Sequence, residues 1–170
     1  MSRKPTVYLD TNIFSALFYS GHDPEAVARH LTTSDWWALE RPFFHLWASL
    51  ATVAELRAGH YPGQGSAIAE AMRLRHLPFT APVKHCAQLL LSADVVPLSK
   101  PGDAFQLAFA TMHALDYLLT WNHAHLTNVD AQRKLQRLCE RQKWRMPALV
   151  SPETIPKAAF GQEILRPNEE

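Results

Sequence analysis

The 170-residue chain is long enough for one domain with a substantial core, and its 47% hydrophobic content excludes an intrinsically disordered protein. The 17 Lys and Arg residues balance 16 Asp and Glu residues, so net charge does not indicate a nucleic-acid partner. Cys86 and Cys139 supply neither a disulfide framework nor zinc-ligand spacing. We expect a cytoplasmic protein without a membrane segment, because the sequence has no bilayer-length apolar run and no signal-peptide pattern.

The apolar run from Val7 to Leu9 predicts a buried strand, which a carboxylate, a hydroxyl and an amide follow directly. Ligands of parallel α/β sheets bind beyond the carboxyl ends of the strands, so Asp10 is a candidate site residue. Thr11 or Asn12 is expected to cap the helix that follows. On this stretch alone, Asp10 is explained equally well as a turn residue or a helix cap.

A second helix is indicated by Asp23 as the cap and Pro24 at the first helical position, and it extends to about residue 40. It carries Trp36 and Trp37. Exposed aromatic side chains can stack on nucleic-acid bases, but we expect this pair to lie in the core or in an interface.

Residues 43–48 predict the second strand, and residues 49–59 predict the helix after it. This helix places Glu55 near its start, at the same edge of the sheet as Asp10. A single glutamate on a helix is more often simply solvated, so the pattern alone leaves both interpretations open.

A helix over residues 66–75 and a weak strand over residues 76–80 follow, and Pro78 indicates that this strand lies at the sheet edge. A helix from Pro82 to Leu91 comes next. These elements carry no candidate site residue.

The helix predicted over residues 103–115 is almost wholly apolar in its interior and begins with Asp103. An acid at a helix start is favoured by the helix dipole alone. A helix this apolar is a buried one, however, and burial raises the cost of a carboxylate without a role.

The strand predicted over residues 116–122 resembles the first, because an apolar run ends in Thr120 and Asn122. His123 and His125 have a spacing that can bind a metal, but loop histidines are more often simply polar, and we do not expect them to be ligands.

A long helix begins at Asn128 or Asp130 and is followed by a last strand over residues 146–150. Charged helix faces are usually only solvated, but this one is our candidate for contact with phosphates. Its basic side chains are Arg133, Lys134, Arg137, Arg141, Lys143 and Arg145.

Strands alternate with helices throughout the sequence. This alternation predicts a three-layer α/β/α sandwich with a central, mainly parallel sheet. We expect a single domain over residues 1–155 and a proline-punctuated C-terminal tail over residues 156–170.

Such a sheet can bring Asp10, Glu55, Asp103 and Asn122 to one edge. Carboxylates in this proximity cannot all be ionised without a cation, and oxygen ligands suit Mg²⁺ or Mn²⁺. The sequence therefore predicts a metal–phosphate site, but it does not choose among nucleases, phosphatases and binding proteins.

Four segments of the chain are similar to the four motifs of the PIN-domain family, most of all to those of its VapC-like toxin branch. That branch also fits the Trp36–Trp37 pair and the closing residues 150–153. The similarity extends from about Val7 to Ile155. The four segments are residues 8–12, 52–56, 103–108 and 117–122.

The resemblance implies a PIN-like fold and an endoribonuclease that depends on Mg²⁺ or Mn²⁺. It assigns Asp10, Glu55 and Asp103 as metal-binding acids and Asn122 to the fourth acidic position. It also implies a small antitoxin protein as partner and a homodimer.

The residues that order this site are expected to be Thr11, Asn12 and Thr120. The chain departs from the family at two positions: Asn122 is not an acid, and Gln106 stands where this branch often has a histidine.

Two other functions remain open on the sequence. Asn122 and the neutral net charge suit a catalytically weak module that binds RNA or protein. Phosphatases of the haloacid-dehalogenase kind also place an aspartate after the first strand, but here Asn12 replaces their second acid.

Overall fold

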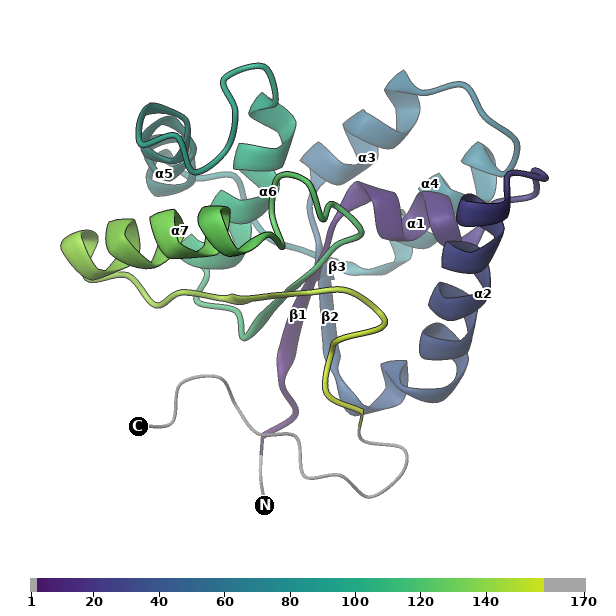
Figure 1. Cartoon of the computed structure of the whole chain (residues 1–170). Coiled ribbons are helices and arrows are strands. Elements are labelled where there is room, and N and C mark those ends of the chain that lie inside the picture. Colours follow the sequence, from purple (N-terminus) through teal and green to yellow (C-terminus); the bar gives the residue numbers. More distant parts are fainter. Residues whose placement is uncertain (1–2, 158–170) are drawn as a thin grey trace.

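The structure, a computed structural model, describes residues 3–157 of the chain. Within this range, five parallel strands form one sheet in the order β3-β2-β1-β4-β5 (Figure 1). The strands are β1 (Thr6–Leu9), β2 (His45–Ala48), β3 (Arg75–His76), β4 (Tyr117–Leu119) and β5 (Ala148–Val150). The helices are α1 (Thr11–Leu17), α2 (Pro24–Leu39), α3 (Leu50–Ala58), α4 (Gln64–Arg73), α5 (Ala81–Ser92), α6 (Pro101–Met112) and α7 (Val129–Gln142), and the 3-10 turn η1 (Arg41–Phe43) precedes β2.

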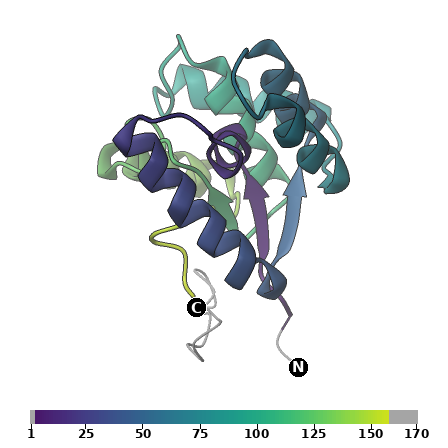
Figure 2. The same ribbon diagram turned by 90° about the vertical axis from the view of Figure 1, so that its right-hand side faces the viewer.

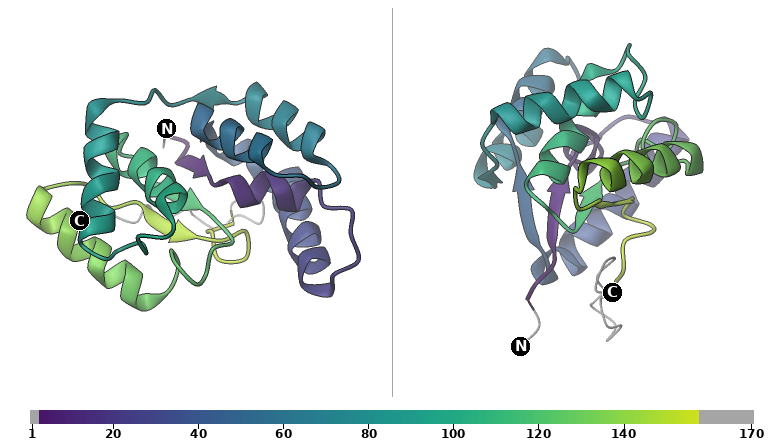
Figure 3. Two further views of the ribbon diagram at one scale, coloured as in Figure 1. Left: turned by 90° about the horizontal axis from the view of Figure 1, so that it is seen from above. Right: turned by 90° about the vertical axis from the view of Figure 1, so that its left-hand side faces the viewer.

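Helices cover both faces of the sheet because side chains alternate along each strand. Val7 and Leu9 of β1 pack in one core with Trp36 and helices α1 to α4. Tyr8 points to the opposite face, where its ring stacks on Phe109 in a second core with α5, α6 and α7. Figure 3 shows the two helical groups on either side of the strands. The three-layer α/β/α sandwich that the sequence predicted is confirmed.

The long helix α2 begins at Pro24 with Asp23 as its cap, as expected, and it lies on the side of the molecule that faces the viewer in Figure 2. Asp23 accepts from the Ala26 N–H at 2.9 Å. Trp36 is buried and packs against Phe44, and Trp37 is partly buried against the same core, so the predicted place of this pair is confirmed.

The third strand is shorter than the sequence predicted, with only Arg75 and His76 in the ladder instead of residues 76–80. Pro78 has no N–H to donate, and the chain leaves the sheet before it. The expected position at the edge of the sheet is correct. The first half of β2 is therefore not paired with β3.

Two helices begin where the sequence did not place them. Asp10, and neither Thr11 nor Asn12, caps α1, and α6 begins at Pro101 rather than at Asp103. Proline suits the first turn of a helix because its missing N–H would have no intrahelical partner there.

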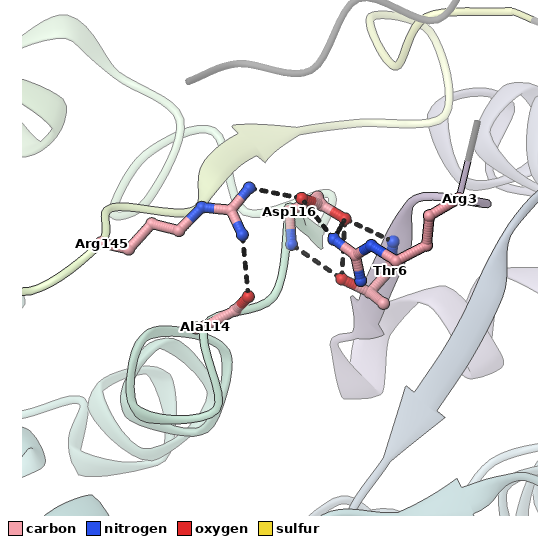
Figure 4. Close-up of polar contacts among 5 residues, drawn as sticks. All are labelled: Arg3, Thr6, Ala114, Asp116 and Arg145. Atoms are coloured by element: carbon pink, nitrogen blue, oxygen red, sulfur yellow. Dashed lines mark hydrogen bonds and ion pairs between the residues drawn. The ribbon is translucent and has the colours of Figure 1, made fainter. Parts of the chain in front are cut away.

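Asp116 lies at the end of the sheet where the strands begin, opposite to their carboxyl ends, and it holds neighbouring segments together there (Figure 4). This buried carboxylate, just before β4, accepts from the Thr6 N–H at 2.7 Å and from the Thr6 hydroxyl at 2.9 Å. Arg145 and Arg3 pair with it.

The predicted basic helix ends earlier than expected, because α7 stops at Gln142 and Lys143 and Arg145 lie beyond it. Arg145 pairs with Asp116 and Lys134 pairs with Asp94, so both contribute less to the predicted basic face.

No helix within residues 3–157 is both long and apolar enough to span a membrane. Most of the predicted tail, residues 158–170, lies outside the described residues.

Candidate active site

Asp10 lies directly after β1, and only 3% of its surface is exposed. Its Oδ1 accepts from the Thr11 N–H at 2.7 Å. Its Oδ2 accepts from the Thr120 hydroxyl at 2.6 Å and from the side-chain amide of Asn12 at 3.1 Å. Thr120 follows β4, which is paired with β1. Two neighbouring strands therefore bring these four predicted site residues together.

Asn12 also fixes the chain after β4. Its Oδ1 accepts from the Trp121 N–H at 2.9 Å, and its Nδ2 donates to Thr120 Oγ1 at 3.1 Å as well as to Asp10. Each polar atom of this side chain thus has a partner, so its amide has one favourable orientation. Asn12 holds Asp10 and Thr120 in fixed relative positions.

Glu55 joins this group through Thr11, whose hydroxyl donates to Glu55 Oε2 at 2.8 Å. The glutamate lies in the middle of α3, and not near its start as the sequence suggested. It is an exposed side chain whose Oε2 is nevertheless hydrogen-bonded. Helix α3 follows β2, so this residue reaches the carboxyl edge of the sheet from the opposite side to Thr120.

Gln106 is the site residue that the sequence prediction left out. Its Nε2 donates to Glu55 Oε2 at 2.9 Å and to Thr11 Oγ1 at 3.1 Å, while its Oε1 accepts from the Thr52 hydroxyl at 3.4 Å. The Tyr8 hydroxyl lies 3.2 Å from Thr52 Oγ1. The departure from the family at this position marked Gln106 in the sequence, but its contacts could come only from the structure.

Asp103 lies half-buried in the first turn of α6, as predicted. Its Oδ2 accepts from the side-chain amide of Asn122 at 2.8 Å. The preceding residue is Gly102, where an added Cβ would lie 3.5 Å from Glu55 Oε1. The second carboxylate oxygen of Glu55 therefore lies against the start of α6, next to Asp103.

Asp103 and Glu55 both act electrostatically on Asp10, and Glu55 also acts on Asp103. Burial raises the pKa of Asp10 to about 7, to which Asp103 and Glu55 contribute, although the Thr120 hydroxyl opposes the rise. The pKa of Asp103 is also raised, mainly by burial and partly by Glu55, against the effects of Asn122 and His125. A positive charge between these groups would favour their ionised forms.

The donor chemistry fits a hard divalent cation, because all three acids supply oxygen atoms and repel one another when ionised. Within residues 3–157, no three His, Cys, Asp or Glu side chains form a ready metal-binding group. Asp10, Glu55 and Asp103 are neighbours rather than a closed ligand set. Mg²⁺ is usually bound through one or two carboxylates and several waters, so an open arrangement still suits it.

The two loop histidines stand apart from the acids' hydrogen bonds. His123 Nδ1 lies 2.8 Å from the Thr127 hydroxyl. His125 contacts the site through its backbone, whose N–H donates to Asn122 Oδ1 at 3.0 Å. Neither imidazole joins a metal-binding group in the described part of the chain.

No protein-family model matches the sequence, and no curated protein matches it significantly. Solved structures do match. FitAcB from Neisseria gonorrhoeae is 20% identical, with 87% of this chain and 99% of that chain covered and a TM-score of 0.50. VapC20 from Mycobacterium tuberculosis, described as a sarcin-ricin loop cleaving toxin, is 22% identical over 75% of this chain and 93% of that chain, also with a TM-score of 0.50.

VapBC2 from Rickettsia felis, solved bound to a DNA fragment from its promoter, is 15% identical over 86% of this chain and 98% of that chain, with a TM-score of 0.50. At such identities the likeness establishes the fold. The chain therefore has the PIN-like three-layer α/β/α fold of VapC-like toxins, in agreement with the four sequence motifs.

Proposed function

We propose that this protein is a divalent-metal-dependent endoribonuclease that hydrolyses RNA phosphodiesters in the cytoplasm. The observation that carries the proposal is the convergence of Asp10, Glu55 and Asp103 at the carboxyl edge of the sheet, where Glu55 and Asp103 help to raise the pKa of the buried Asp10. The PIN-like fold also supports the proposal, because the sequence resemblance implies this chemistry for a protein with that fold.

In this proposal Asp10, Glu55 and Asp103 hold Mg²⁺ or Mn²⁺. Such an ion lowers the pKa of a bound water and neutralises charge that develops on a phosphodiester. Thr120 and Asn12 keep the Asp10 carboxylate in place. Thr11 and Gln106 do the same for Glu55, and Asn122 does so for Asp103. Because these side chains are already held in position, little free energy is needed to rearrange them during the reaction.

We further propose that the protein is the toxin of a type II toxin–antitoxin module, with a small antitoxin protein as its partner, and that it forms a homodimer. The support is the fold shared with VapC20 and with the complexes FitAcB and VapBC2. A short neighbouring reading frame that encodes a DNA-binding protein, together with co-purification of the two products, would test the partner.

The nuclease is tested by incubating the purified protein with RNA in the presence of Mg²⁺, Mn²⁺ or a chelator. We expect cleavage with either metal, none with the chelator, and none for Asp10→Asn. Asp35→Asn is a matched control, because this acid is exposed on α2 and outside the site. Cleavage that survives Asp10→Asn would refute the assignment.

One observation favours a second function, a catalytically weak module that binds RNA or protein. Asn122 offers Asp103 a hydrogen-bond donor where a fourth acid would supply a ligand oxygen. Titration with Mn²⁺ separates the two functions. The nuclease predicts saturable binding that Asp10→Asn weakens, whereas a module without catalysis predicts no specific divalent site at the three acids.

A further inference from the structure

Three arginines from separate parts of the sequence surround one hollow beside β2. The hollow has a volume of about 490 Å³, and none of the described residues that line it is an acid. We call it the arginine hollow, defined by Arg41, Arg73, Arg75, Trp37 and His45. This basic surface has no pattern in the sequence, because its arginines come from three different elements: η1, the end of α4 and the start of β3.

The topology explains why the hollow exists. The strand β3 pairs only with Trp47 and Ala48, the second half of β2. The first half, His45 and Leu46, lines the hollow instead of contacting a described strand on that side. Unpaired sheet edges are usually protected by charge, and arginines surround this one.

Neighbouring side chains hold the guanidinium groups in place. Arg41 lies 4.5 Å from the centre of the Trp37 ring, and Arg75 lies 5.8 Å from that of Trp47. Glu70, largely buried just outside the hollow, pairs with Arg73 at 3.1 Å and with Arg41 at 3.7 Å. One carboxylate thus orients two of three cations without neutralising all of them.

The alternative basic surface, the face of α7, is less available than its composition suggests. Lys134 forms ion pairs with Asp94 and Asp130. Arg145, which the sequence placed on this helix, lies beyond the end of α7 and pairs with the buried Asp116. Arg73, in contrast, keeps 74% of its side chain exposed although it pairs with Glu70. The hollow also gathers its three arginines around one concave surface that no acid lines among the described residues, so it is the better candidate for binding an anion.

We propose that the arginine hollow binds backbone phosphates of RNA whose scissile bond lies at the three acids. This inference rests on the proposed ribonuclease function and adds a second contact with the substrate. Guanidinium groups match phosphate geometry, and arginines interleaved with aromatic rings are typical of surfaces for single-stranded nucleic acid. The hollow lies at the start of β2, whereas the acids lie beyond the carboxyl ends of the strands, and β2 itself spans about 13 Å. An RNA strand that contacts both places must therefore extend over at least this length.

The test measures binding of a labelled single-stranded RNA at several salt concentrations, with a chelator present to prevent cleavage. The double variant Arg73→Gln/Arg75→Gln removes two exposed cations from the hollow. We expect weaker binding at every salt concentration. The slope of log K against log salt should become shallower by about 0.7 for each lost phosphate contact.

The matched control is Arg137→Gln/Arg141→Gln, which removes the same charge from exposed positions on α7. It should bind RNA like the wild type. Equal binding by the wild type and the hollow variant, or a loss confined to the α7 variant, would overturn the proposal. Thermal unfolding of both variants checks that each is folded.

Two further results separate this proposal from others. If the hollow variant loses binding to polyglutamate but keeps its affinity for RNA, the hollow is a docking site for an acidic protein and the proposal is wrong. If it loses RNA binding while the wild type cleaves no RNA with any metal, the proposed nuclease fails and the phosphate-binding hollow stands.

Discussion

Asn122 donates its side-chain amide to Asp103 Oδ2 at 2.8 Å, which links the loop after β4 to the first turn of α6. The other side-chain atom, Oδ1, accepts from the His125 N–H at 3.0 Å. The amide therefore replaces a possible fourth negative charge with a donor that favours ionised Asp103. Asn122, which stands where the family pattern has an acid, thus takes part in the site as a hydrogen-bond donor to Asp103.

Replacing Asn122 by aspartate should have opposite effects on the stability of the metal-free protein and on its affinity for Mn²⁺. Asn122→Asp keeps the acceptor for His125 but removes the donor to Asp103, so we expect the metal-free protein to lose about 1–3 kcal/mol of unfolding free energy. Its affinity for Mn²⁺, measured by calorimetry, should rise because a fourth acid is added. Asn122→Ala is the control, since it loses the donor without a new charge. An affinity for Asn122→Asp below that of Asn122→Ala would contradict the prediction.

Removing the amide of Gln106 should weaken the site without removing an acid. Gln106→Met keeps a similar shape but gives Glu55 and Thr11 one donor fewer. Residues that orient metal ligands typically affect metal affinity or activity by about 10- to 100-fold, and we expect a loss in that range. Mn²⁺ titration measures it. Gln136→Met, at an exposed position on α7, should bind Mn²⁺ like the wild type.

Most of the fold could be predicted from the sequence, because apolar runs and helix caps are local signals. The strand at Val7 to Leu9 and the cap at Asp23 are where these patterns placed them. The length of β3 was wrong, because hydropathy does not show where a strand loses its neighbour.

The candidate site was predictable only in part. The motifs named the three acids, and topology brought them together at one edge. Two features required coordinates: the hydrogen bonds of Gln106, and the convergence of Arg41, Arg73 and Arg75 from different elements. Neither leaves a periodic or local pattern, because both depend on contacts between residues far apart in the sequence.

The pKa of Asp10 predicts how stability depends on pH in the absence of metal. Its folded value of about 7 lies above the ordinary 3.8, so the folded state binds the proton more tightly. The resulting stabilisation is fully present below pH 3.8 and is lost as the pH rises through about 7. In a chelator, the unfolding free energy of the wild type should therefore decline between about pH 4 and 7 more steeply than that of Asp10→Asn.

Saturating Mn²⁺ should reduce this decline, because a cation favours the ionised carboxylate. Urea unfolding at a series of pH values measures both effects. A parallel pH dependence of the wild type and Asp10→Asn would show that folding does not raise the pKa of Asp10, contrary to the prediction.

Asp116, at the opposite edge of the sheet, should have the reverse pH dependence. Burial alone would raise its pKa, but the N–H and hydroxyl of Thr6 and the guanidinium of Arg145 lower it below the ordinary value of 3.8. Its stabilising effect is thus present above pH 3.8 and is lost as the pH falls further. This loss of stability contributes to acid unfolding, and it occurs at a lower pH than the range in which Asp10 titrates.

We expect Asp116→Asn to cost roughly 3 kcal/mol of unfolding free energy, the lower end of the range for a broken buried ion pair. The lower end applies because Arg3 and Arg145 keep 51% and 34% of their side chains exposed and can be hydrated when the charge is lost. Urea unfolding at neutral pH measures the cost. Because Asp116 lies at the other end of β4 from Thr120, the variant should bind Mn²⁺ with wild-type affinity, and a large loss of affinity would show that the two edges of the sheet are coupled.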